Sequence, residues 1–258
     1  MWPRGPELTV IERIQTPRGE LQLQKRFGHY EIIFNGVFLM ATYNGDSEME
    51  MVRLGLERLD AGALSLKVLV GGLGAGYTVR AALQSAKVKR VDVVEIEPCV
   101  IRWNQNLLRE YNQGALFDPR VRVINDDLAS YLGKGGASTY DLIALDVDNG
   151  PEWVVLESNR ALYRTSGLRK LKKALARNGL LAVWSAGRSK HLRAAMVRVF
   201  GNAEEVAVLG KFDGVPQRNP MDNCLQCPAH PGRGSGTAEP KKEPEAYVYL
   251  ARNEKQGK

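Results

Sequence analysis

Glycines cluster at residues 71–76, in the run Gly71-Gly72-Leu73-Gly74-Ala75-Gly76, directly after the apolar segment Val68-Leu69-Val70. Glycine allows a sharp turn and a close approach to a ligand, and a helix that begins there offers free N–H groups. Glu95 ends the next apolar segment, where a carboxylate can accept hydrogen bonds from two ribose hydroxyls. The pattern predicts a nucleoside site, with a purely structural turn as the alternative. A nicotinamide site is disfavoured because the spacing is not G-x-G-x-x-G.

Two further acidic pairs stand where apolar segments end. Asp126 and Asp127 follow Val121–Ile124, and a carboxylate there can accept a hydrogen bond from the amino group of an adenine. Either residue could instead cap a helix that begins near Leu128, and the two roles can coexist. Asp146 and Asp148 follow Leu142–Leu145, at the kind of strand end where open α/β sheets bind ligands.

The elements that must position these residues alternate between apolar strands and helical patterns from residue 67 onward. This alternation predicts a parallel sheet covered on both faces, and hence a doubly wound α/β fold with a mainly parallel seven-stranded sheet. The expected strands are 68–70, 90–95, 121–124, 142–145, 179–184, 204–208 and 246–251. The expected helices are 77–86, 98–111, 127–133, 166–177 and 189–200.

The residues before this region predict a different, smaller unit. Residues 7–43 hold short β-rich runs, two of them joined by Asn35-Gly36, a strong hairpin signal. We therefore expect a small antiparallel β domain at 1–46, a helix at 47–59, and a nucleoside-binding domain at 47–258. Residues 213–244 are rich in Gly, Pro, Lys and Glu without periodicity, so we expect a flexible insertion there.

Composition excludes several classes of function. The net charge is +7, but Lys and Arg are scattered without interleaved aromatics, so no nucleic-acid partner is expected. No run is long and apolar enough to span a membrane, and the first residues lack a signal-peptide pattern, so we expect a cytoplasmic protein. Cys224, Cys227 and His230 have knuckle-like spacing, but three ligands fall short of a structural zinc site, and no metal is expected.

Taken together, the motifs resemble the spermidine synthase (polyamine aminopropyltransferase) family, in the form of a divergent bacterial member. The resemblance is carried by the glycine turn 71–76, Val94-Glu95-Ile96-Glu97-Pro98, Asp118-Pro119-Arg120-Val121 leading to Asp127, and Tyr140–Asp146. It implies a class I S-adenosylmethionine-methyltransferase-type domain, a homodimer, a small-molecule amine acceptor, and S-adenosylmethionine or its decarboxylated form as co-substrate. It also implies that Glu95 holds the ribose, Asp127 the adenine edge, and that Asp146 faces the reacting carbon.

The sequence departs from this family at three places in the reactive pocket. The family's Asp that holds the aminopropyl amine is Gly74 here, its Asp-Ser/Thr-x-Asp-Pro motif reads Asp146-Val147-Asp148-Asn149-Gly150-Pro151, and its Tyr-His-Glu reads Glu48-Met49-Glu50. We expect a spermidine-synthase-like transferase that alkylates an amine. A methyltransferase is one alternative, because an Asp at position 74 would repel the carboxylate of S-adenosylmethionine. A non-catalytic nucleoside-binding protein is another.

Alkyl transfer from a sulfonium depends mainly on positioning and desolvation, because the leaving group is already activated. A carboxylate at a central strand end can accept the proton of the amine nucleophile or hold the amine in line. Asp146 is the first candidate and Asp148 the second, although a plain turn also explains Asp148. Glu48 and Glu50 could face a cationic substrate or solvent. Trp103 and Trp184 are expected to pack in the core or at its rim.

Overall fold

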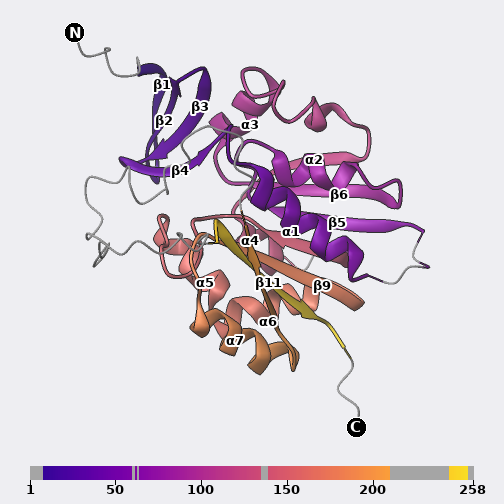
Figure 1. Ribbon diagram of the computed structural model, residues 1–258. Helices are drawn as coiled ribbons and strands as arrows, with labels where there is room; N and C mark the ends of the chain where they lie inside the picture. The colour runs from indigo at the N-terminus through magenta and orange to yellow at the C-terminus, as the bar shows by residue number, and fades with distance from the viewer. Residues whose placement is uncertain (1–7, 60–61, 63, 135–138, 210–243, 255–258) are drawn as a thin grey trace, which may run out of the picture.

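The chain folds into two β-sheets, and helices cover the larger one (Figure 1). The structure is a computed structural model that describes residues 8–59, 62, 64–134, 139–209 and 244–254. The insertion expected at 213–244, with Cys224, Cys227 and His230, lies outside the described residues except for its last residue. The division at residue 46 stays a prediction.

The N-terminal sheet is antiparallel, as predicted. It consists of β1 (Thr9–Thr16), β2 (Gly19–Arg26), β3 (His29–Phe34) and β4 (Val37–Ala41), in that spatial order. Asn35 and Gly36 have φ of +48° and +78°, which gives the tight β3–β4 turn that the Asn-Gly pair predicts. Side chains from this sheet join the same apolar core as residues of the larger sheet, so the two sheets pack together.

The larger sheet has seven strands in the order β10-β11-β9-β8-β5-β6-β7, and this confirms the predicted fold class. Five neighbouring strands, from β9 to β7, are parallel, and β11 runs antiparallel to β9 and β10. The chain enters this sheet at β5 and adds β6 and β7 on one side of it. It then returns to place β8 on the other side of β5. A ligand cleft is expected where β5 and β8 end side by side. The strands are β5 (Leu66–Gly71), β6 (Val88–Glu95), β7 (Val121–Asn125), β8 (Tyr140–Leu145), β9 (Leu175–Ser185), β10 (Glu204–Val208) and β11 (Ala246–Arg252).

Helices cover both faces of this sheet because side chains along its buried strands point alternately to the two sides. Val68 and Val70 belong to one apolar cluster, whereas Leu69 belongs to the other. The helices are α1 (Asp46–Glu57), α2 (Tyr77–Leu83), α3 (Pro98–Gln105), α4 (Leu128–Gly133), α5 (Arg160–Tyr163), α6 (Thr165–Ala174) and α7 (Lys190–Phe200), with short 3₁₀ turns at Ala115–Phe117 and Glu157–Asn159. None of the helices in the described part is long and apolar enough to cross a membrane.

Three predicted helix ends were wrong, and the first is that of the helix expected over 77–86, which ends at Leu83. The helix expected over 98–111 ends at Gln105, because Asn106 leaves helical geometry with φ −122° and ψ −90° and Leu108 N–H donates to the carbonyl of Trp103. The helix expected over 166–177 ends at Ala174, and β9 follows at once, with Asn178 in a left-handed conformation at φ +62°. Neither irregularity follows from hydrophobic periodicity.

One buried carboxylate ties four strands of the sheet together. Asp92 on β6 has no exposed surface and accepts hydrogen bonds from Tyr140 of β8 at 2.8 Å and Arg90 at 2.9 Å. Arg122 of β7 lies 3.2 Å away and Lys67 of β5 lies 3.8 Å away. Loss of the Asp92 carboxylate would deprive the buried Tyr140 hydroxyl of this acceptor and leave the partly exposed Lys67, Arg90 and Arg122 close together without a counter-charge.

We therefore expect Asp92→Ala to lower the free energy of unfolding by about 3 kcal/mol, measured by urea titration. Arg53→Gln is the contrast, because Arg53 pairs with Glu50 and Glu57 on the exposed face of α1. That change should cost less than about 1 kcal/mol. Equal losses in the two variants would contradict the role of Asp92.

Candidate functional site

The glycine turn joins β5 to α2 and lies against the end of β8. Gly72, Gly74 and Gly76 have φ of +90°, +51° and +83°, a backbone region that favours glycine. A Cβ atom on Gly72 would lie 1.9 Å from the carbonyl oxygen of Asp146, so only glycine fits there. Gly71 ends β5, and Gly72 and Gly74 line a cavity. The turn therefore brings the backbone close to both a ligand space and Asp146.

The predicted ribose ligand, Glu95, lies at the end of β6 and lines the same cavity. One carboxylate oxygen accepts a hydrogen bond from Leu73 N–H at 2.9 Å, and the other accepts from Glu97 N–H at 2.8 Å. Burial raises the pKa of Glu95 to about 7, and these two hydrogen bonds work in the opposite direction. The carboxylate is thus oriented by the glycine turn itself.

Asp126 and Asp127 follow β7 and also line the cavity. Asp127 caps α4, since its side chain accepts from Ser130 N–H at 2.7 Å, which is the capping role that the sequence left open. Asp126 accepts from Asp127 N–H and pairs with Lys134 at 2.5 Å. The adenine contact stays a prediction, and the positions of both carboxylates beside Glu95 allow it.

Asp146 lies at the end of β8, facing the cavity from beside the glycine turn. Its carboxylate accepts a hydrogen bond from the buried Thr78 hydroxyl at 2.6 Å. Thr78 is the second residue of α2. The helix that follows the glycine turn therefore also orients Asp146. Burial raises the pKa of Asp146.

Glu48 is a cavity residue that the sequence could not separate from its neighbour Glu50. Glu48 lines the cavity, while Glu50, two positions later on α1, accepts from Arg53 Nε at 2.6 Å on the outer face. Glu48 accepts from Ser47 Oγ at 2.7 Å, and Ser47 Oγ in turn accepts from Trp184 Nε1 at 3.0 Å. Burial and the negative charge of Asp146 both raise the pKa of Glu48. The buried Glu48 and the partly exposed Asp146 therefore form a pair of interacting carboxylates.

Trp184 lines this cavity from the end of β9, in addition to packing as the sequence predicts. Trp103 packs fully in the core and donates from Nε1 to Glu12 at 2.6 Å. Its neighbour Asn104 donates to the carbonyl of Gly74 at 2.8 Å and so supports the glycine turn from α3. The position of Trp184 at a central strand end was the available signal for its place in the site.

Asp148 organises a loop. Its carboxylate accepts four hydrogen bonds, from the N–H groups of Asn149 at 2.9 Å, Val155 at 2.7 Å and Leu156 at 3.1 Å, and from the Asn159 amide at 3.0 Å. Burial raises its pKa, and these hydrogen bonds oppose the shift. A direct catalytic role for Asp148 stays a prediction. Both oxygens of its carboxylate already accept hydrogen bonds from the protein.

The cavity has an apolar wall and an acidic one. The N-terminal sheet supplies the apolar wall: Leu21, Ile32, Phe34, Leu39 and Met40. The larger sheet and α1 supply seven acidic residues: Glu48, Glu95, Glu97, Asp126, Asp127, Asp146 and Asp148. No Lys, Arg or His occurs among the described residues that line it. Such a site favours a ligand with positive charge next to apolar groups.

A family model for the spermine/spermidine synthase domain matches residues 63–206. The chain belongs to this family. The matched residues include the glycine turn, Glu95, Asp126, Asp127, Asp146 and Asp148, whereas Glu48 and the apolar wall lie outside the matched segment. The resemblance stated from the motifs is therefore confirmed.

Individual relatives match about half of the chain. The chain is 30% identical over 118 residues to a polyamine aminopropyltransferase of Prochlorococcus marinus subsp. pastoris, covering 46% of this chain and 40% of that protein. It is 35% identical over 119 residues to one of Mycobacterium tuberculosis (45% and 22%) and 29% identical over 159 residues to one of Aeropyrum pernix (58% and 49%). Each match spans less than half of the relative.

Solved structures support the fold over a longer range. Spermidine synthase from Thermotoga maritima superposes with a TM-score of 0.67 at 17% identity, over 95% of this chain and 73% of that one. Human methyltransferase-like protein 13, solved with SAH, gives 0.51 at 20% identity, over 83% and 81%. Both comparisons agree with the predicted methyltransferase-type sheet.

The raised pKa of Glu48 has a consequence for stability. The folded protein holds the Glu48 proton to a higher pH than the unfolded chain, so the stability of the fold decreases as pH rises above the ordinary carboxyl range. We expect Glu48→Gln to raise the free energy of unfolding by roughly 1–3 kcal/mol at about pH 8 and to change it little at about pH 4. Glu50→Gln on the outer face is the control. A pH-independent effect of Glu48→Gln would contradict the assignment.

Proposed function

We propose that this protein is an aminopropyltransferase-type enzyme that transfers an alkyl group from a sulfonium nucleoside to an amine. The observation that carries the proposal is the cavity, because the nucleoside-type turn, Glu95 and the carboxylate pair Glu48 and Asp146 all line it. Both reactants are cations, a sulfonium and an ammonium, and the acidic lining without a basic residue among its described members suits both. Family membership supports the same chemistry.

In the proposed reaction, Glu95 accepts the ribose hydroxyls, and Asp127, with Asp126 beside it, receives the adenine edge. The acceptor ammonium approaches the carboxylate pair and loses one proton to it, which frees the nitrogen lone pair. That lone pair attacks the carbon next to sulfur, the C–N bond forms, and the C–S bond breaks. The two electrons of the C–S bond stay on sulfur, which leaves as a neutral thioether nucleoside. The apolar wall excludes water from this step.

Gly74 bears on which sulfonium nucleoside is the donor. A Cβ atom on Gly74 would find Met40 Cγ as its nearest neighbour at 3.9 Å, so space for a side chain exists. Without a carboxylate at position 74, nothing there holds a donor amine or repels a donor carboxylate. We propose decarboxylated S-adenosylmethionine as the donor, in line with the family, and Gly74 supports methyl transfer from S-adenosylmethionine as the second candidate.

The remaining parts of the proposal follow the family resemblance. We place the enzyme in the cytoplasm, as a homodimer that acts on a small-molecule amine. The aliphatic residues of the N-terminal sheet suit the carbon chain of such an amine, while its nitrogen meets the carboxylate pair.

Calorimetry tests the donor site. The wild-type protein should bind decarboxylated S-adenosylmethionine more tightly than S-adenosylmethionine, and it should bind methylthioadenosine. Glu95→Ala should weaken binding by about 100-fold, because two hydrogen bonds to a charged group are lost. Glu110→Ala removes an exposed carboxylate and should change nothing. Unchanged affinity in Glu95→Ala would refute the ribose assignment, and tighter binding of the carboxylated form would favour methyl transfer.

Turnover tests the carboxylate pair. We expect Asp146→Asn to reduce the rate of alkyl transfer by about 100-fold or more while donor affinity stays within about threefold. Mass spectrometry of the amine product separates aminopropyl from methyl transfer. The wild-type rate should rise with pH, since the pair must be able to accept a proton. Full turnover in Asp146→Asn would show that the proton acceptor lies elsewhere.

A further inference from the structure

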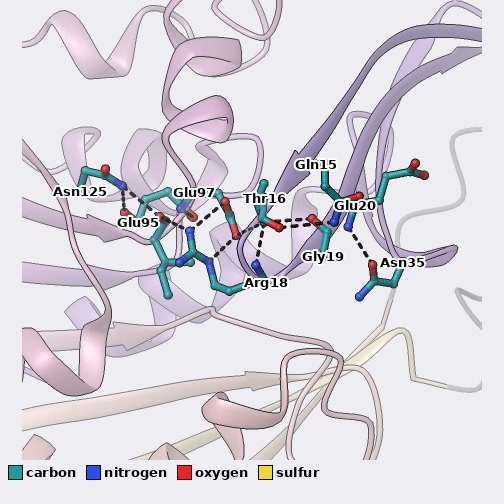
Figure 2. Close-up of polar contacts among 10 residues, drawn as sticks. Gln15, Thr16, Arg18, Gly19, Glu20, Asn35, Glu95, Glu97 and Asn125 are labelled. Carbon is teal, nitrogen blue, oxygen red and sulfur yellow. Dashed lines mark hydrogen bonds and ion pairs between the residues drawn. The ribbon is translucent and has the colours of Figure 1, made fainter.

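The tip of the β1–β2 hairpin, residues 16–19, reaches from the N-terminal sheet to the segment that follows Glu95 (Figure 2). Arg18 forms a two-point ion pair with Glu97, with Nε at 2.6 Å from one carboxylate oxygen and Nη2 at 3.1 Å from the other. Nη2 also donates to the carbonyl of Ile96 at 3.3 Å. Thr16 Oγ1 donates to Glu97 at 3.3 Å and accepts from Arg18 N–H at 3.2 Å. The turn is therefore held by its own hydrogen bond, and the guanidinium is held by Glu97 and Ile96.

The segment that Arg18 contacts is the one that orients Glu95. Glu97 N–H donates to the Glu95 carboxylate at 2.8 Å. On the other side, the Asn125 side chain donates to the carbonyl oxygens of Glu95 at 2.8 Å and Ile96 at 3.1 Å. Figure 2 shows Glu95 and Glu97 between Asn125 of β7 and Arg18 of the hairpin. The hairpin tip of the N-terminal sheet thus contacts the segment that orients Glu95, and Arg18 is its charged contact.

The charges around this contact are unevenly distributed. Glu97 is almost completely buried, with 7% of its side chain exposed, and its negative charge disfavours ionisation of Glu95. Arg18 is attracted to Glu97, Glu95 and Asp127, in that order of strength. The nearby Asp126 is paired with Lys134, which directly follows α4. Arg18 thus neutralises the negative charge of Glu97. Glu97 lines the cavity, whereas Arg18 lies behind it.

We propose that Arg18 is a positioning residue for the nucleoside: by neutralising Glu97 from the N-terminal sheet, it keeps the Glu95 carboxylate ionised and correctly aimed. The role in catalysis rests on the proposed function, in which Glu95 binds the ribose. The charge coupling itself is a property of the protein without ligand. A protonated Glu95 would offer a donor where the ribose hydroxyls need an acceptor.

The ionisation of Glu95 can be followed in the ligand-free protein by NMR titration of its ¹³C-labelled carboxyl group, assigned with Glu95→Gln. We expect Arg18→Gln to raise the Glu95 titration midpoint by about one pH unit, a tenfold change in proton affinity. Arg18→Lys should restore part of the shift. Arg102→Gln is the matched control, because Arg102 anchors the same hairpin to α3 through Glu12 at 2.6 Å. It should leave the midpoint unchanged.

A double variant separates charge from mechanical attachment. Arg18→Gln with Glu97→Gln lacks the ion pair, but it also lacks the uncompensated charge, so the Glu95 midpoint should return close to the wild-type value. An unchanged midpoint in Arg18→Gln, or a double variant as shifted as the single one, would overturn the proposal. Calorimetry with decarboxylated S-adenosylmethionine at about pH 7 adds the functional readout, with binding about fivefold weaker in Arg18→Gln because the ionised fraction of Glu95 falls by about that factor. A shifted midpoint in a protein that binds no nucleoside would instead refute the proposed function alone.

Discussion

The backbone of Gly72 passes the carbonyl of Asp146 so closely that no side chain fits between them. Backbone hydrogen bonds maintain this approach: Asp146 N–H donates to Gly71 at 2.7 Å and Gly72 N–H donates to Val94 at 2.9 Å. The ends of β5, β6 and β8 are thereby joined at one point. Because the strand order reverses between β5 and β8, that point is also where the cleft opens.

The site depends on carboxylates held where water is largely excluded. Glu48, Glu95 and Asp146 all have raised pKa values, and burial is the largest cause for each. A buried carboxylate without a counter-charge lowers stability, and protein N–H and O–H groups offset only part of this. The acidic cavity therefore lowers the stability of the fold, and its carboxylates are explained by function. A bound sulfonium or ammonium would supply the missing positive charge.

The small N-terminal sheet has two roles in this arrangement. Its apolar face closes the cavity opposite the acidic strand ends, with Leu21 and Ile32 almost fully buried. Its first hairpin carries Arg18 to the back of the acidic wall. The larger sheet therefore contributes the carboxylates, and the smaller sheet adjusts both their surroundings and their charge. Family membership through residues 63–206 describes only the first of these contributions.

The sequence by itself determined the strand and helix pattern, the glycine turn and the acidic strand ends, because these depend on local periodicity and on backbone demands that only glycine meets. It could not decide between Glu48 and Glu50. Side chains two positions apart on a helix point to different sides, and only the packing of α1 shows which side faces the cavity. It could not show that Asp148 is occupied by loop N–H groups. The contact of Arg18 with Glu97 joins residues 79 positions apart, and only the tertiary structure brings such residues together.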